Sequence, residues 1–350
     1  MLENLKLSER DIQDLRELIP LTILKDEEFN KYVNIKTGIR QGDQLGFIGE
    51  LSALGKSGAG CNPEYGKLSI ENSEKRWSLG DWEIAKEICY KELEGSIAEL
   101  SFKTGTDIAD LTSTQFANQI LYPALDAAVR KMIWRIGWFN DKSAAHVGDG
   151  GVITDGVDLD LMNVEDGLFK RIFTQVAANG SQRTEIAANG QSTAAAQKTA
   201  LWTKGVATGI VDTVLADADA RIAENGGILM MTRGMANALA NDIKKVYNTQ
   251  LKWETVFSGF DVTEYDGVQV ARIGVWDEMI RTYENNGTKL NLPYRIVYGN
   301  PQNFLVGTGG SAIFDKFDIW FERKERTNNI YATGKIGTLI GEETLFQAAY

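Results

Sequence analysis

The stretch that most constrains the fold is the end of the chain, which reads as consecutive strands up to its last residue. Every second position of one segment is aromatic or aliphatic: Phe317, Ile319 and Phe321. This period of two predicts a strand with one apolar face. A turn at Asn328-Asn329 leads into a second long strand, about Tyr331 to Ile340, and a short third strand runs from Thr344 to Tyr350. Terminal residues are ordered only where something ties them down, so we expect the last side chains to pack against the body.

The composition is that of an ordinary globular protein, with 43% hydrophobic and 24% charged residues among 350. We find no run of about 18 apolar residues and no charged-then-apolar start, and therefore expect neither a transmembrane helix nor a secretory signal. Cys61 and Cys89 are the only cysteines, too few for a disulfide framework, which favours a reducing cytoplasm. The formal net charge of −11 argues against a protein that binds nucleic acid by neutralising phosphates.

Residues 45–90 predict a long β-hairpin that leaves the body of the protein. Apolar segments flank a glycine-rich tip between Gly55 and Gly66, which permits unusual backbone angles. A two-stranded ribbon is marginally stable alone in water, so it needs a surface to lie on. Trp77 and Trp82 stand on the return limb, where a projecting ribbon offers them no core. We therefore expect both tryptophans to contact a partner.

The middle of the chain alternates helices and strands. Apolar residues recur at every fourth position between Thr114 and Phe139, which predicts a long helix that Pro123 kinks or begins. Trp134 and Trp138 lie one turn apart in this helix, and we predict that both side chains belong to the core. A second helix has its apolar face between Leu168 and Val176, with Asn163 and Asp166 as its expected cap and Asn179-Gly180 as its stop.

Two later strands and a hairpin complete this centre. The strand Gly227 to Met231 lies between two amphipathic helices, and Thr232 is placed to cap the second. Asp266-Gly267 predicts a tight hairpin turn, and residues 294–307 predict two more short strands. The segment 180–204 consists mainly of small and polar residues, and we predict that it is an excursion over the surface.

The sequence offers no constellation of residues for catalysis. His146 is the lone histidine, which excludes sites that need two imidazoles, and no G-x-S-x-G nucleophile elbow occurs. We interpret His146 as a solvated loop residue. The carboxylates of Asp155, Asp158 and Asp160 do not match the spacing of a calcium loop, and "GTGG" at 307–310 lacks the ending of a P-loop. We expect no catalytic, cofactor-binding or metal-binding residues, and hence no enzyme.

The order of the elements resembles that of a known family. Residues 214–239, "VLADADARIAENGGILMMTRGMANAL", have a helix, a strand and a helix in turn, and residues 317–350 carry the long strands and the ending. With an arm, a projecting hairpin and a long helix before them, they resemble the tailed-bacteriophage major capsid proteins of the Hong Kong 97 fold. The two segments are similar to parts of that family's axial (A) and peripheral (P) domains.

The resemblance implies an α+β fold of four parts. Residues 1–44 would be the N-terminal arm, and residues 45–90 the extended (E) loop. Residues 91–145 and 311–342 would form the P-domain, with its long spine helix and long β-strands. Residues 146–310 and 343–350 would form the α/β A-domain.

It also implies a structural function. Members of the family self-assemble as hexamers and pentamers into an icosahedral head around double-stranded DNA, which they enclose without sequence-specific binding, and their E-loops lie over neighbouring subunits. The candidates for subunit contact here are Lys56, Tyr65, Trp77, Trp82, Phe346 and Tyr350. The protein would assemble in the bacterial cytoplasm, without a membrane, into a virion capsid with a portal and possible decoration proteins. Because Met1 precedes the hairpin so closely, we expect a separate scaffolding protein.

Three alternatives stay open. Some relatives crosslink a loop lysine to an asparagine, and Lys56 or Lys67 with Asn328 or Asn329 could take those roles, but so loose a pattern arises by chance and we expect no crosslink. An encapsulin-type nanocompartment has the same fold and encloses enzymes in place of DNA. A soluble α/β enzyme or binding protein with an unrecognised site is the third, because fold alone does not fix function.

Overall fold

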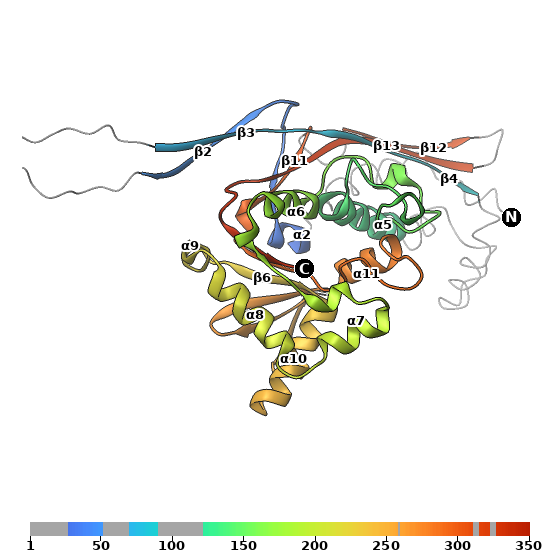
Figure 1. The fold of residues 1–350 in the computed structure, drawn as a ribbon. Coiled ribbons are helices and arrows are strands. Elements are labelled where there is room, and N and C mark those ends of the chain that lie inside the picture. The colour runs from blue at the N-terminus through green and yellow to red at the C-terminus, as the bar shows by residue number, and fades with distance from the viewer. Residues whose placement is uncertain (1–26, 52–69, 90–121, 258–259, 311–314, 323–326) are drawn as a thin grey trace, which may run out of the picture.

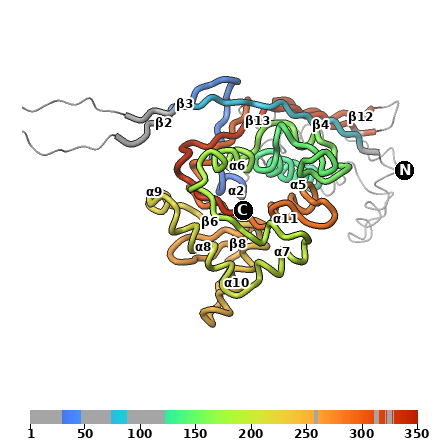
Figure 2. The backbone as a smooth tube through the Cα atoms, in the orientation of Figure 1, coloured from blue at the N-terminus to red at the C-terminus, as the bar shows by residue number. Residues whose placement is uncertain are grey.

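The computed structural model describes residues 27–51, 70–89, 122–257, 260–310, 315–322 and 327–350. Two β-sheets with helices between and beside them make up the body, and a two-stranded hairpin projects from one side (Figure 1). The tube in Figure 2 shows the same arrangement, with the C-terminus near the middle of the body. This is a mixed α+β architecture, as expected.

The five-stranded sheet is organised around one long strand, β13 (Thr327–Ile340). Along one edge β13 pairs with β4 (Gly80–Cys89), and along the other it pairs first with β12 (Lys316–Glu322) and then with β11 (Phe304–Thr308). A parallel strand, β1 (Asn34–Lys36), extends the sheet beyond β11. The long strand predicted near the end of the chain is therefore present.

The seven-stranded sheet has the order β5-β14-β10-β6-β9-β8-β7. Its strands are β5 (Arg183–Thr184), β14 (Phe346–Ala349), β10 (Ile296–Gly299), β6 (Ile228–Thr232), β9 (Val268–Ile273), β8 (Phe260–Tyr265) and β7 (Glu254–Phe257). The β6–β9 and β5–β14 pairs are parallel and the others antiparallel. The chain thus ends in a strand inside a sheet, as its last residues predicted.

Side chains of the seven-stranded sheet alternate between two cores, as the pleat of a strand requires. Leu229 and Met231 pack into the core formed with α8 (Val206–Asp217) and α10 (Arg233–Tyr247). Met230, between them, faces the other core. Three short helices lie beside these elements: α7 (Ala194–Leu201), α9 (Ala220–Glu224) and the 3-10 turn η9 (Ala187–Gly190).

The second core fills the space between the two sheets. It contains α5 (Tyr122–Trp134), its π-helical continuation η5 (Arg135–Phe139), α6 (Leu168–Ala178), α11 (Gly274–Tyr283) and α2 (Glu27–Tyr32). Trp138 is fully buried there, with ring centroids 4.7 Å from Trp276 and 5.2 Å from Phe169. Trp134 is buried as well, so the interpretation of both helix tryptophans as core is confirmed.

Several local predictions are confirmed. Asp266 and Gly267 join β8 to β9 with φ angles of 48° and 76°, the left-handed pair that a tight hairpin turn of this type demands. Thr232 is the N-cap of α10, although its own side chain makes no capping hydrogen bond. The Asp277 carboxylate accepts hydrogen bonds from the N–H groups of Arg233 and Gly234 in its place.

One helix-cap prediction and one turn prediction are wrong. Helix α6 begins after Gly167, not at an Asn163–Asp166 cap. Gly167 lies so close to the backbone of Trp138 that a Cβ there would come within 2.8 Å of its carbonyl carbon. Asn328-Asn329 is not a turn but part of β13, where both residues pair with β12 and β4.

The segment 180–204 is not a surface excursion. It contributes β5 to the seven-stranded sheet and buries Ile186, Ala188 and Leu201 in the core beside α8 and α10. Most of its polar residues are exposed, but three amide side chains, those of Gln182, Asn189 and Gln197, are buried and bond to main-chain groups. Gln197 donates to the carbonyls of Asn189 and Leu290 at 3.0 and 2.9 Å.

The predicted hairpin 45–90 is shorter than expected. Only β2 (Gln44–Leu51) and β3 (Ile70–Arg76) form the projecting ribbon. Beyond Arg76 the chain enters the body, where β4 pairs with β13 along ten residue positions. This difference decides where the two hairpin tryptophans lie.

Candidate functional site

The described residues hold no group of three or more His, Cys, Asp or Glu side chains placed to bind a metal ion. His146 lies in a loop, half-buried, with Nε2 2.7 Å from the carbonyl oxygen of Val157. Asp155 and Asp158 accept hydrogen bonds from nearby backbone N–H groups, those of Gly148 and Asp160. Over the same residues, no helix is long and apolar enough to cross a membrane.

The feature of the fold without an evident intramolecular role is the projecting hairpin. Among the strands that the structure describes, β2 and β3 pair only with each other, from Gln44–Arg76 outward to Leu51–Ile70, with an irregularity between Ile48 and Leu51. A ribbon of two strands gains little stability by itself. In Figures 1 and 2 it extends well away from the helices and from both larger sheets.

The hairpin is fixed to the body at its base by Trp77. This side chain is 2% exposed and packs with Leu305 and Leu339 of the five-stranded sheet. Its ring lies over Gly307, where a Cβ would come within 2.6 Å of the ring, so the sheet needs glycine at that position. Its backbone N–H also donates to the carbonyl of Asp43 at 2.9 Å, which closes the base of the ribbon.

Trp82 is buried by the same sheet. It lies on β4 opposite Gly334, is 5% exposed and belongs to the core between the sheets. The expectation that Trp77 and Trp82 contact a partner is therefore wrong for the side chains themselves. The physical reason is that the chain enters the body after Arg76 and pairs with β13 from Gly80 onward, so the five-stranded sheet supplies the core that a free ribbon lacks.

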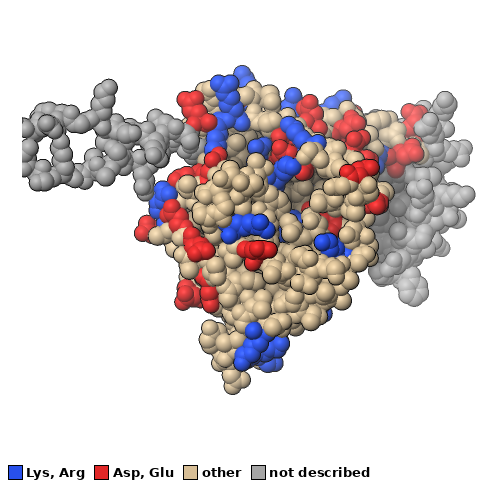
Figure 3. Space-filling model, in the orientation of Figure 1, with Lys and Arg blue, Asp and Glu red and all other residues tan. Residues whose placement is uncertain are grey.

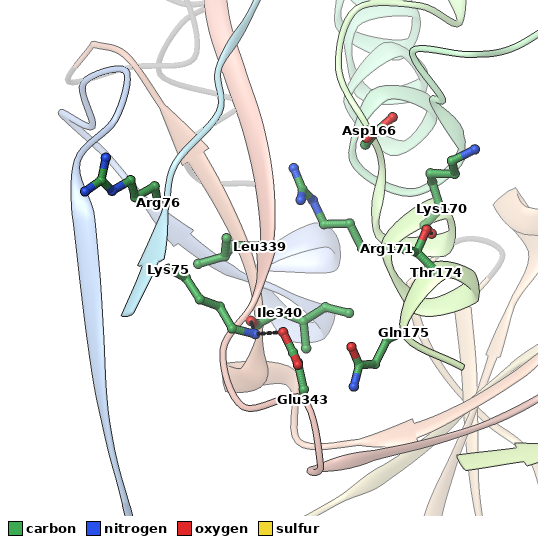
Figure 4. A pocket seen from close by; sticks show the side chains of 10 residues that line it. All are labelled: Lys75, Arg76, Asp166, Lys170, Arg171, Thr174, Gln175, Leu339, Ile340 and Glu343. Atoms are coloured by element: carbon green, nitrogen blue, oxygen red, sulfur yellow. Dashed lines mark hydrogen bonds and ion pairs between the residues drawn. The ribbon is translucent and has the colours of Figure 1, made fainter. Parts of the chain in front are cut away.

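A lysine provides a second attachment of the hairpin. Lys75 Nζ donates to the carbonyl of Ile340 at 2.8 Å and lies 2.7 Å from a Glu343 carboxylate oxygen. Ile340 is the last residue of β13, and Glu343 lies in the short connection from β13 to β14. Figure 4 shows this link beside a pocket whose opposite wall is α6. Lys75 could not be identified from the sequence, because its partners are distant in the chain.

The C-terminal strand β14 lies between β10 and β5. Phe346 is 1% exposed in the core between the sheets, so its side chain is not available for subunit contact and that expectation is wrong. Tyr350 remains half-exposed, with its ring centroid 4.4 Å from Phe173 and 4.6 Å from the Arg183 guanidinium carbon. The expected packing of the chain end against the body is confirmed.

Neither a protein-family model nor a curated protein matches the chain. Solved structures do match. A chain of "Satellite phage P4 procapsid including size determination (Sid) protein" is 10% identical, with a TM-score of 0.50, over 95% of this chain and 98% of that one. The chain has a phage capsid fold.

Two further solved structures are similar at lower scores. A chain of "Capsid of empty GTA particle computed with C5 symmetry" is 11% identical, with a TM-score of 0.49, over 92% of this chain and 88% of that chain. A chain of "Crystal structure of virus-like particle from Pyrococcus furiosus" is 9% identical, with a TM-score of 0.37, over 98% and 100% of the two chains.

Within this capsid fold, the six expected contact residues separate into three groups. Trp77, Trp82 and Phe346 are buried in their own chain, and Tyr350 is at the surface. Lys56 and Tyr65 lie outside the described residues. On the face in Figure 3, cationic and anionic side chains are interspersed over the upper half, while the lower half, over α8 and α10, is mostly uncharged.

Proposed function

We propose that the protein is the major capsid protein of a tailed phage, which self-assembles as hexamers and pentamers into an icosahedral head around double-stranded DNA. The observation that carries the proposal is the likeness of fold over nearly the whole length of both this chain and the P4 procapsid chain. The projecting two-stranded hairpin supports it, because such a ribbon gains a stable environment when a second copy covers it.

The parts of the proposed capsid subunit follow the two sheets. The five-stranded sheet with α5 serves as the P-domain, and the seven-stranded sheet with its helices serves as the A-domain. We place residues 80–89 in the P-domain because β4 pairs with β13, so the E-loop ends near Arg76 and not at residue 90. The same sheet contains β11, so residues 304–308 also belong to the P-domain and not to the A-domain. Residues 1–44 serve as the N-terminal arm, whose strand β1 extends the P-domain sheet by pairing with β11.

The role is structural and not enzymatic. Partners are other copies of the chain, a separate scaffolding protein, a portal and possible decoration proteins, with assembly in the bacterial cytoplasm. An excess of acidic residues, 48 against 37 Lys and Arg, suits an enclosure that holds DNA without binding its sequence, since repulsion keeps phosphates from adhering.

Electron microscopy of the purified full-length chain tests the proposal. We expect closed shells of uniform size. A chain that remains monomeric at every concentration, with or without a scaffolding partner, would contradict the proposal and favour a soluble enzyme or binding protein. Boiling the shells in detergent is expected to release single chains, and a ladder of covalent multimers would contradict the absence of crosslinks.

The second candidate is an encapsulin-type compartment, which the shared fold allows. Particles isolated from the native host distinguish the two. A phage head is expected to contain double-stranded DNA and one portal vertex, whereas an encapsulin would contain a protein cargo and no portal.

A further inference from the structure

Cationic side chains outnumber carboxylates in the lining of the pocket at the base of the hairpin. The pocket has a volume of about 340 Å³ and lies between β3, the end of β13 and α6 (Figure 4). Four cationic side chains and two carboxylates line it, while the whole chain has a formal net charge of −11. Both carboxylates already have partners: Glu343 is paired with Lys75, and Asp166 accepts the Lys142 N–H. Two of the other cations are paired as well, Lys170 with Asp141 and Arg171 with Glu165, so the pocket offers unused donors and not a large excess of charge.

Two side chains of α6 point into the pocket with donors to spare. Arg171 and Gln175 stand one helical turn apart and are directed toward the hairpin and β13 in Figure 4. Arg171 uses Nε to donate to Thr338 Oγ1 at 2.7 Å and Nη2 to donate to Glu165 at 3.4 Å. A guanidinium carries five N–H groups. Within the described part of the chain, neither its Nη1 nor the Gln175 carboxamide makes a hydrogen bond.

The surroundings favour an added negative charge at this point. Burial is the main reason that the pKa of Arg171 lies below its usual range, and Glu165 and Asp166 offset only part of this effect. Leu339 and Ile340 line the pocket as well and are almost fully buried. A carboxylate beside Arg171 would be partly shielded from water, where a charge-assisted hydrogen bond is strongest.

We propose that this pocket receives an Asp or Glu side chain from a second copy of the chain during assembly, with Arg171 Nη1 and the Gln175 amide as donors. Two observations favour this occupant. Acidic residues outnumber basic ones in the chain, so a second copy supplies carboxylates, and the pocket adjoins the projecting hairpin, so a neighbour that covers the ribbon also reaches the pocket. The inference rests on the proposed function and adds to it one specific contact.

The experiment compares charge variants at Gln175, which is half-buried and whose side chain supports no other described group. Gln175→Glu places a carboxylate in the pocket and repels the incoming one. We expect a rise of about tenfold or more in the concentration needed for shell assembly, measured by light scattering, because a hydrogen bond to a charged group contributes about 1.5–3 kcal/mol and 1.4 kcal/mol is a factor of ten. Gln175→Lys is expected to assemble at least as well as the wild type.

The matched control is Gln191→Glu, which adds the same charge at an exposed residue after η9, and it is expected to leave assembly unchanged. Thermal unfolding of all variants should coincide. A zero-length carbodiimide crosslinker is then applied to shells of mixed isotopic labelling assembled from Gln175→Lys, because Lys75 is already paired with Glu343 of its own chain. It is expected to join the amine introduced at position 175 to an acidic residue of another copy. That crosslinked peptide identifies the incoming carboxylate.

The outcomes separate this inference from the proposed function. Shells that form equally well from Gln175→Glu would overturn the inference and leave the proposed function standing. Shells that form normally from this variant but contain less DNA would also overturn it, and would point to a phosphate as the ligand of the pocket. A wild type that never assembles would overturn both.

Discussion

Replacing Trp77 by alanine tests directly whether this residue belongs to its own chain or to a subunit contact. Its side chain is 2% exposed and packs with Leu305 and Leu339 in a small cluster at the base of the hairpin. Truncation of a buried tryptophan to alanine costs about 3–5 kcal/mol. We expect the low end, about 3 kcal/mol, because the cluster lies at the edge of the body, where neighbouring side chains can close part of the cavity.

The measurement is urea unfolding of unassembled protein, followed by far-ultraviolet circular dichroism. The matched control is Trp320→Ala, on the outer face of β12, where the tryptophan is 40% exposed. Substitutions at such positions usually change the free energy of unfolding by less than about 0.5 kcal/mol. An unchanged free energy of unfolding in Trp77→Ala, together with a loss of shell assembly, would refute the intramolecular role and restore the role expected from the sequence.

One deletion and two substitutions have defined consequences. Deleting Leu345–Tyr350 removes β14 from between β5 and β10, and we expect insoluble protein and no shells by electron microscopy; normal shells would show that the strand is dispensable. Asn303→Ala removes three side-chain hydrogen bonds. The Asn303 amide donates to the carbonyls of residues 342 and 345 at 2.9 and 3.1 Å, and its oxygen accepts from the N–H of residue 342 at 2.6 Å. At roughly 1 kcal/mol per bond, urea titration should show a free energy of unfolding that is lower by about 2–3 kcal/mol. Asp242→Asn has a pH-dependent effect. Burial by itself would raise the pKa of Asp242, but hydrogen bonds from Gly205 and Thr208 outweigh it and the pKa lies below its ordinary value. The carboxylate therefore stabilises the fold at pH 7 and loses this contribution as the pH falls through its folded pKa. We expect Asp242→Asn to lower the free energy of unfolding by about 2 kcal/mol at neutral pH, and this difference from the wild type should become smaller below pH ~4. A difference of the same size at pH 2 would contradict the prediction.

The parts of the fold that the sequence predicts correctly depend on local signals. The β8–β9 turn follows from Asp266-Gly267, and the last strands follow from an apolar period of two. The buried face of α6 follows from helical spacing between Leu168 and Val176. In each case the residues that decide the structure are neighbours in the chain.

The end of the hairpin could not be located in this way, because it depends on a partner more than two hundred residues later. Strand β4 is held by β13, whose register places Trp82 opposite Gly334. One local signal was present: polar Asp81 and Glu83 alternate with apolar Trp82 and Ile84. That pattern is typical of a strand with one buried face, and it favours a place in the body over a free ribbon.

The segment 180–204 was misinterpreted for a different reason: its composition is polar, yet several of its side chains are buried. Gln182 donates to the carbonyls of Glu343 and Phe346 at 2.6 and 3.0 Å, and the Asn189 amide donates to the carbonyl of Tyr294 at 2.8 Å. Buried amides of this kind satisfy main-chain groups that would otherwise be unpaired. Hydropathy measures transfer from water and contains no information about such partners.

These contacts explain why the chain ends in a packed strand. Two connections between the sheets, β10 to β11 and β13 to β14, run side by side, and Asn303 in the first bonds to residues of the second. Lys75 of the hairpin is attached to Ile340, the last residue of β13, and to Glu343 in the second connection. One attachment of the hairpin and two connections between the sheets therefore meet at one junction. Strand β14 secures that junction from beyond it, because its pairing with β10 and β5 fixes the far end of the connection. A frayed C-terminus would loosen the base of the hairpin, which is the element that the proposed assembly uses most.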